Sequence, residues 1–273
     1  MSQSARVFPV IPAEWPDLVD ELDRWEEAGR VATLWWRDDD AVAPSRALER
    51  LVSIAGQVPI ALAVIPVRAQ AELAAWLSDH RVSVPGARID VLQHGWNHSN
   101  HSVGAKKSEF PAERSSADVA SELAEGRRRL TRLLGTRALP VLVPPWNRFD
   151  DRHLPFLRHC GLSGISRAKP RRRARPVLGI VEANVHVDLV AWAGGRNFIG
   201  EEAALSSLIA HLRARRLGLA CADEPTGILT HHLIQDEPTE AFLQRLLEVT
   251  GAHVAAHWLE AIEIFVPETA AAA

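Results

Sequence analysis

Short apolar segments alternate with longer segments of helical periodicity along most of this chain. The apolar segments lie at 31–36, 58–65, 89–92, 139–143, 164–166, 185–190 and 228–230. Apolar residues recur at helical spacing at 45–55, 69–77, 116–134, 201–217 and 239–249. The apolar segments lack the alternation of half-buried strands, so they predict strands covered on both faces, as in a parallel sheet or barrel. The chain is therefore expected to be an α/β protein, and its seven candidate strands favour a barrel.

The length of 273 residues fits one domain of the size of an enzyme. We expect residues 1–273 to form a single domain, with the motif-bearing core at about 31–232 and a helical C-terminal segment at 239–265. The net charge of -3 argues against nucleic acid as a partner. A basic run at 169–175, flanked by prolines, predicts an exposed loop.

Cysteine usage and the N-terminal residues bear on where the protein works. Cys160 and Cys221 lie far apart, without CxxC spacing or a flanking histidine pattern, so they indicate neither a disulfide framework nor a cysteine-rich zinc site. The N-terminal residues lack the apolar segment of a secretion signal, and no segment has the roughly 20 apolar residues that cross a bilayer. We expect a cytoplasmic protein with no membrane partner. The oligomeric state is left open.

Acidic residues follow the first predicted strand. Three consecutive carboxylates, Asp38, Asp39 and Asp40, come directly after Arg37. Reactive groups of α/β barrels lie at the carboxyl ends of the strands. Adjacent carboxylates there repel one another unless protons or a cation compensate, and a metal ion is the simplest compensation. The alternative is that they cap the next helix or lie in a solvated loop.

Histidines follow the third predicted strand. His94 and His98 are four residues apart, so one helical turn would place both imidazoles on the same side. Neutral imidazole is a preferred ligand of zinc and similar ions, and Asp39 on another strand end is a candidate carboxylate ligand. His101 could share that face. A second pair with the same spacing, at 253 and 257, has no strand-end carboxylate beside it and is interpreted as histidines on a helix surface.

Two further strand ends carry candidate groups. Two prolines before Trp146 fix the loop backbone, and the indole offers a flat face that packs on a sugar ring; the alternative is a rigid turn over the core. His231 and His232 follow Thr230. Adjacent side chains on a strand point to opposite faces, so one of these histidines faces the barrel interior or its mouth. Geometry alone does not choose between them.

In order and spacing, these segments resemble the five motifs of the NodB-like polysaccharide deacetylases, carbohydrate esterase family 4. The matching segments are Asp38-Asp39, His94-Gly-Trp-Asn-His98, Val143-Pro-Pro-Trp146, Val187-Asp188-Leu-Val-Ala-Trp192 and Ile228-Leu229-Thr230-His231. The resemblance covers about residues 31–232 and marks a divergent member. It implies a distorted (β/α)7 barrel and a metal-dependent hydrolase that removes an acyl group, typically acetyl, from an N-acylated sugar or related small conjugate.

The resemblance also implies roles for individual residues. Asp39, His94 and His98 would hold a divalent metal ion, with zinc favoured and cobalt, manganese or nickel as alternatives. A metal with three protein ligands activates water and polarises the amide oxygen. Asp38 would act as the general base and His231 as the general acid. Substrate contacts are expected from Trp96, Trp146, Asn147, Trp192 and His232.

Two positions depart from the family pattern. Val143 stands where the family has an arginine, and Ala191 stands where it has an aspartate. In the family these two groups form a charged pair that orients the base. The loss of both is consistent with a replaced network, because the loss of one would leave a buried charge unpaired. Arg37, Arg148 and Asp188 are the candidate replacements.

Other functions remain open at this point. The absence of a secretion signal favours a small-molecule or oligosaccharide substrate over a cell-wall polymer. One alternative is a non-catalytic protein on the same fold that binds metal or carbohydrate or has a regulatory role. Another is a hydrolase of a non-sugar amide or ester. Retention of Asp38 and His231 favours an enzyme, because holding a metal requires neither.

Overall fold

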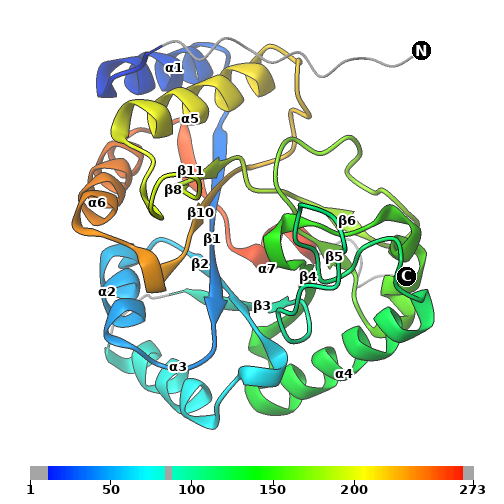
Figure 1. Cartoon of the computed structure of the whole chain (residues 1–273). Helices are drawn as coiled ribbons and strands as arrows, with labels where there is room; N and C mark the ends of the chain where they lie inside the picture. The colour runs from blue at the N-terminus through cyan, green and yellow to red at the C-terminus, as the bar shows by residue number, and fades with distance from the viewer. Residues whose placement is uncertain (1–11, 84–87, 267–273) are drawn as a thin grey trace, which may run out of the picture.

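The computed structural model describes residues 12–83 and 88–266. Parallel strands in the order β6-β5-β4-β3-β2-β1-β10-β7 curl into an open barrel, and β11 pairs with β1 (Figure 1). Their bounds are β1 Ala32–Ala41, β2 Ile60–Val64, β3 Ile89–His94, β4 Ala138–Val143, β5 Gly164–Ile165, β6 Val181–Glu182, β7 Val187–Asp188, β10 Thr226–Thr230 and β11 Ala256–Trp258. The short strands β8 (Val190–Ala191) and β9 (Asn197–Phe198) pair antiparallel. The predicted fold class, a distorted (β/α)7 barrel, is confirmed.

Helices surround the strands in Figure 1. They are α1 Trp15–Glu27, α2 Arg46–Ala55, α3 Ala71–Ser83, α4 Ser116–Leu134, α5 Glu201–Arg216, α6 Glu237–Ala252 and α7 Ala261–Phe265. Short 3-10 helices are η1 Pro66–Arg68, η2 Gly135–Arg137, η3 Pro145–Asn147, η4 Asp151–Cys160 and η5 His232–Ile234. Within residues 12–83 and 88–266, none of the helices combines the length and the apolar character that crossing a membrane requires.

Strand β1 separates two apolar layers. Leu34 and Trp36 belong to the cluster that packs beneath the surrounding helices. Trp35 belongs to the cluster that fills the barrel, where Phe265 of α7 packs edge-on with ring centroids 5.9 Å apart. Successive side chains of a strand point to opposite faces, so the odd positions of β1 face the barrel interior. This alternation decides where the acidic residues at the end of β1 point.

The C-terminal segment differs from the expectation of a helical 239–265. Strand β11 lies between α6 and α7 and pairs with the beginning of β1, Ala32 opposite Ala256. His253 and His257 therefore do not share a helix surface. His253 ends α6 and its Nε2 contacts Asp23 at 3.1 Å, whereas His257 lies on β11. The sequence gives no sign of this break because β11 has only three residues.

The basic run at 169–175 is a largely exposed loop, as the sequence predicts, with Arg171 as the exception. Arg171 is buried, its Nη1 donates to the main-chain oxygen of Glu182 at 2.7 Å, and its Nη2 pairs with Asp223 at 2.9 Å. The run therefore contributes one arginine to the interior at the base of the barrel. Cys160 and Cys221 are free thiols, as the sequence predicts.

Candidate active site at the carboxyl ends of the strands

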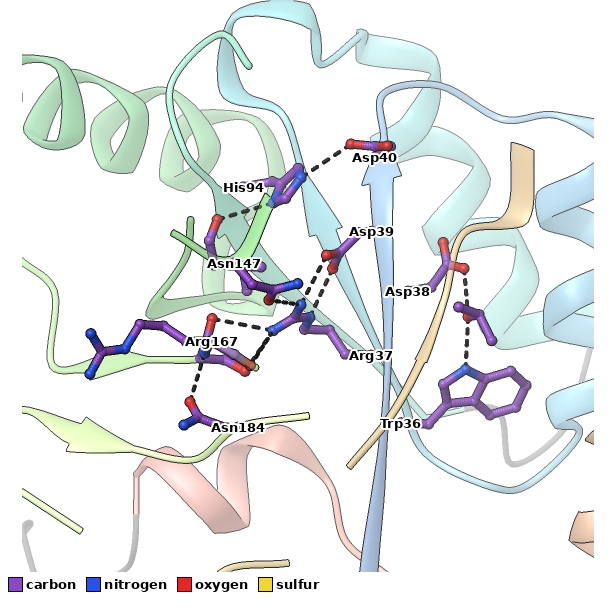
Figure 2. A network of polar contacts seen from close by, with 12 residues as sticks. Trp36, Arg37, Asp38, Asp39, Asp40, His94, Asn147, Arg167 and Asn184 are labelled. Carbon is purple, nitrogen blue, oxygen red and sulfur yellow. Dashed lines mark hydrogen bonds and ion pairs between the residues drawn. The ribbon is translucent and has the colours of Figure 1, made fainter. Parts of the chain in front are cut away.

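The three consecutive aspartates at the end of β1 occupy three different environments. Figure 2 shows Asp38 on the same side of β1 as Trp36, and Asp39 on the opposite side with Arg37. Asp38 shares the helix-facing side because it is an even position of the strand. Asp40 has a left-handed backbone, with φ of 73°, and the register of β1 against β2 shifts between Asp38 and Ala41. This bulge turns the Asp40 side chain toward the mouth of the barrel.

Asp38 does not lie at the mouth, where a general base was expected. Its carboxylate is fully buried and accepts hydrogen bonds from the Thr230 hydroxyl at 2.7 Å and the main-chain N–H of His232 at 2.9 Å. His232 Nδ1 lies 2.5 Å from the other oxygen. Burial lowers the pKa of His232, but the charge of Asp38, its hydrogen bond and the charge of Asp40 together raise that pKa above its ordinary value. Asp38 and His232 thus form a buried ion pair beneath the helices, and His232 is not placed to contact substrate.

Asp39 lies inside the barrel but is not grouped with the two histidines. Its two carboxylate oxygens accept from Arg37 Nε at 2.8 Å and Nη2 at 2.9 Å. The buried Arg37 also donates to Asn147 Oδ1 at 2.6 Å and to the Ser166 hydroxyl at 2.8 Å. Asn147 is therefore occupied with the arginine. Arg37 thus pairs with Asp39 and not with Asp38, the base that it was expected to orient. Arg148 is exposed, and its Nη1 donates to the main-chain oxygen of Lys107.

Asp40 takes the place that the sequence analysis gave to Asp39. One of its oxygens lies 3.1 Å from His94 Nε2 and 3.3 Å from His98 Nε2. These three residues form a group whose potential ligand atoms all lie within 4.8 Å of one another. Burial raises the pKa of Asp40, but the hydrogen bond to His94 and the nearby histidine charges lower it by more. The carboxylate is therefore held ionised at the mouth.

The hydrogen bonds of His94 make this group suitable for a cation. His94 Nδ1 faces the main-chain oxygen of Val143 at 3.0 Å, and because a carbonyl only accepts, Nδ1 carries the proton. In the neutral ring, Nε2 then presents its lone pair to the ionised Asp40. Two acceptors 3.1 Å apart require a proton or a metal ion between them. A histidine that binds a metal through one ring nitrogen usually donates the N–H of the other to a carbonyl or carboxylate. His94 makes this second bond to Val143, so the residues fit a divalent metal.

The segment after His94 is a loop rather than the helical turn that the spacing predicted. Gly95 and His98 both have left-handed backbones, with φ of 58° and 62°. The buried carboxylate of Glu109 accepts from main-chain N–H groups of this loop. His101 lies outside the group of ligand atoms and is exposed. Asp40 and Glu109 are the residues here that the sequence analysis did not single out as site residues; for Glu109 there was no motif that could have found it.

His231 faces the mouth from the end of β10. It shares the parity of Leu229, which lies in the interior cluster. The ring of Trp192 packs edge-on against it with centroids 4.7 Å apart, and His231 Nδ1 is buried without a hydrogen-bond partner. Asp188 accepts from Trp192 Nε1 at 2.7 Å and from Val190 N at 3.1 Å. Burial raises the pKa of Asp188, although the nearby His231 lowers it.

Two of the expected substrate-binding tryptophans line this mouth. The Trp146 ring lies 4.4 Å from that of His98, and its left-handed backbone, with φ of 56°, turns it toward the histidine. Trp192 is half exposed beside His231. Trp96 is instead partly buried against an apolar cluster between the barrel and α4. The indole ring of Trp146 therefore lies beside His98, and that of Trp192 lies beside His231.

Comparisons with solved structures identify the architecture. A protein from Mycobacterium smegmatis assigned as a polysaccharide deacetylase is 16% identical over 94% of this chain and 93% of its own, with a TM-score of 0.57. A family 4 carbohydrate esterase from Streptomyces lividans is 15% identical over 82% and 90%, with a TM-score of 0.51. A Streptococcus mutans CE4 esterase is 14% identical over 91% and 92%, with a TM-score of 0.52. This is the fold of the family 4 carbohydrate esterases.

The family 4 esterase fold agrees with the architecture that the motif resemblance implied. No protein-family model and no curated protein sequence matches the chain. At the identities above, the shared architecture shows the fold alone. The function has to be argued from the site itself.

Proposed function

We propose that this protein is a metal-dependent hydrolase that removes an acyl group, typically acetyl, from the nitrogen of a sugar or related small conjugate. The observation that carries the proposal is the convergence of Asp40, His94 and His98 at the carboxyl ends of β1 and β3. A second carboxylate, Asp39, lies next to them on the interior face, and His231 lies at the end of β10. The fold that this chain shares with carbohydrate esterases supports the same proposed function by analogy.

Asp40, His94 and His98 would hold the metal ion. This differs from the sequence expectation by one residue, because the bulge at Asp40 brings that carboxylate, and not Asp39, to the histidines. A divalent ion such as zinc or cobalt would supply Lewis-acid activation of water and of the amide carbonyl. The donor set of two imidazoles and one carboxylate suits zinc, cobalt, manganese or nickel.

Asp39 would act as the general base in place of Asp38. Its carboxylate is oriented by the two bonds from Arg37, so it can accept a proton from the attacking water without changing its position. Arg37 thereby replaces the arginine that the family pattern places at position 143. The replacement comes from the same strand as the base and is fixed by Asn147 and Ser166.

His231 would donate a proton to the departing amine. Its ring faces the mouth beside Trp192, where a general acid would have to lie to reach the leaving nitrogen. Trp192 orients His231 through its edge contact and Asp188 through its hydrogen bond. Together with Trp146, it offers flat apolar surfaces of the kind that pack against sugar rings.

The test is hydrolysis by metal-loaded protein. Wild type would be assayed for acid release from a panel of N-acetylated amino sugars, oligosaccharides and short amides, with added zinc, cobalt or manganese. Asp39→Asn is expected to retain the metal and lose about 100-fold or more in rate, the typical contribution of a general base. Asp151→Asn, which alters an exposed carboxylate paired with Arg167, is the matched control. Wild type that is loaded with metal and releases no acid from the whole panel would favour a non-catalytic binding protein.

A further inference from the structure

The loop that carries His98 has a backbone that needs support. His98 is not a glycine, yet its backbone lies in the left-handed region, with φ of 62°. Such conformations are unfavourable for residues that carry a Cβ and persist only where surrounding contacts impose them. His94, by contrast, ends β3 and is held by the Val143 carbonyl. The two histidines therefore depend on different supports, and that of His98 must come from outside the strand.

The support is the carboxylate of Glu109. Its Oε1 accepts from the main-chain N–H of Asn97 at 2.8 Å and of His98 at 3.0 Å, and its Oε2 accepts from Trp96 N at 3.2 Å. Glu109 is fully buried. Three successive main-chain N–H groups thus donate to the Glu109 carboxylate, and both of its oxygens act as acceptors. These bonds hold the loop in one backbone conformation.

Glu109 is itself anchored on both sides. Next to it in sequence, the ring of Phe110 lies in the core against Phe149, with centroids 5.5 Å apart. On the other side, Ser108 accepts from His101 N at 2.8 Å through its main-chain oxygen. Packing around the carboxylate is tight, because a Cβ added at Gly95 would lie 2.0 Å from Glu109 Oε2. The carboxylate cannot shift without moving the loop.

We propose that Glu109 is a positioning residue for the metal site: it fixes the backbone of His98 and thereby sets the affinity for the metal ion. This inference rests on the metal site of the proposed function. Glu109 does not contact the ion, and its effect passes through the three amides. Supporting residues of this kind typically contribute 10–100-fold to metal affinity.

The experiment compares Glu109→Gln and Glu109→Asp with wild type. Glutamine keeps the shape but turns an N–H₂ group toward at least one main-chain N–H. Aspartate keeps the charge, but its side chain is one methylene shorter, so its carboxylate cannot reach all three main-chain N–H groups. Glu125→Gln is the matched control, because Glu125 pairs with Arg128 and Arg132 on α4 and contacts neither Glu109 nor the loop. Binding of cobalt chloride to each full-length apoprotein would be followed by its visible absorption, and zinc affinity by competition, at a temperature where every variant is folded.

We expect the dissociation constant for cobalt to rise about 10–100-fold in Glu109→Gln, with altered cobalt absorption bands, and to change less than about twofold in Glu125→Gln. A role confined to stability would lower the melting temperature of the apoprotein without changing the metal affinity of the folded protein. A folded Glu109→Gln protein that binds cobalt within twofold of wild type, with the same bands, would overturn the inference. Should that variant fail to fold, the same criterion applies to Glu109→Asp.

The outcomes separate this inference from the proposed function. If wild type hydrolyses a substrate and Glu109→Gln binds cobalt as wild type does, the positioning role is wrong and the enzyme stands. If Glu109→Gln binds cobalt weakly and metal-loaded wild type hydrolyses nothing, the positioning role stands and the enzyme does not. Wild type that binds no divalent metal would overturn both.

Discussion

Two clusters with the same composition lie at opposite ends of the barrel. The mouth cluster consists of Asp40, His94 and His98, and the base cluster consists of His186, His211 and Glu224. In each, two imidazoles and one carboxylate bring potential ligand atoms within 4.8 Å of one another. The mouth cluster lies at the carboxyl ends of β1 and β3, whereas the base cluster lies beside the amino ends of β7 and β10.

The direction of one hydrogen bond distinguishes the two. At the mouth, His94 Nδ1 donates to a carbonyl, which leaves Nε2 free to bind a cation. At the base, His186 Nδ1 accepts from the main-chain N–H of Gly227 at 2.9 Å, so in the neutral ring Nε2 carries the proton. Burial, with the charges of Arg215 and Arg171, lowers the pKa of His186 to about 3 and keeps the ring neutral. His186 Nε2 points a proton, not a lone pair, toward Glu224 Oε2 at 3.5 Å.

The packing of the base cluster leads to the same conclusion. The rings of His186 and His211 stack with centroids 3.4 Å apart and planes tilted by 16°. A metal ion lies near the plane of each imidazole that binds it, which two stacked rings cannot both provide. Glu224 accepts from the main-chain N–H of Arg171 and of Asn184. The difference teaches that hydrogen-bond direction, and not the proximity of histidines and acids, decides which cluster suits a metal.

The largest expected effect is on metal binding. His94→Ala should lose more than the roughly 100-fold in affinity that supporting residues contribute, because it removes a ligand itself. His186→Ala should still bind one equivalent of metal per folded chain. Calorimetric titration with zinc or cobalt measures both. If wild type bound two equivalents of metal and His186→Ala bound only one, the base cluster would also be a metal site and the distinction between the clusters would be wrong.

A second prediction concerns Asp38, which neighbours the mouth but faces the helices. Asp38→Ala removes the partner of a buried His232 and should cost about 3–5 kcal/mol of the free energy of unfolding. The metal content of the folded fraction should not change. Urea unfolding and elemental analysis test the two parts. A variant as stable as wild type that has lost its catalytic rate would return the role of base to Asp38.

A third prediction follows from Glu224, whose pKa burial raises to about 7 from 4.5. In the unfolded chain this carboxylate ionises at lower pH, so it favours the folded state below about pH 4.5 and that contribution is lost as pH rises to 7. His186 has the opposite sign, because its contribution is lost as pH falls from 6.5 toward 3. The difference in unfolding free energy between wild type and Glu224→Gln should therefore shift by on the order of 3 kcal/mol between pH 4.5 and 8. Parallel pH profiles of the two proteins would contradict it.

The smallest expected effects come from a pair of single hydrogen bonds. Trp192→Phe removes the bond to Asp188 at the mouth and should raise KM about fivefold, or roughly 1 kcal/mol, with little change in melting temperature. Thr226→Val removes the hydroxyl that bonds His211 and Arg215 at the base and should lower stability by about 1–3 kcal/mol without changing KM. If Thr226→Val changed KM and Trp192→Phe lowered stability instead, the ends of the barrel would not be functionally separate.

The order of strands and helices could be predicted from the sequence, but the directions of the aspartates could not. Apolar segments and helical periodicity locate most elements because burial on both faces leaves a clear signal. Leu34, Trp35 and Trp36 are all apolar, so the part of β1 that precedes the aspartates shows no alternation that would assign its faces. The bulge at Asp40 then reverses the expected parity. One usable signal was present: Arg37 and Asp39, two apart on a strand, share a face.

Tertiary contacts explain the rest of what the sequence did not reveal. His94 and His98 are brought together by a loop that Glu109 holds, and nothing in the spacing of the histidines points to a carboxylate eleven positions farther on. The buried position of Arg171 depends on Asp223 and on the Glu182 main chain. Such contacts join segments that are distant in sequence, so periodicity and motif spacing cannot predict them.

The pairing of β1 has a consequence for how the chain folds as it is synthesised. On one side its neighbour is β10, about 190 residues later, and its first residues pair with β11, which comes later still. At a translation rate of roughly 5–20 residues per second, an apolar strand bearing Asp39 and Asp40 waits on the order of 10–40 seconds for its partners. During that interval β2 is its one neighbour in the final sheet already made. We therefore expect nascent chains that end before β10 to recruit chaperones, and His231 to join the candidate site only after β10 emerges from the ribosome.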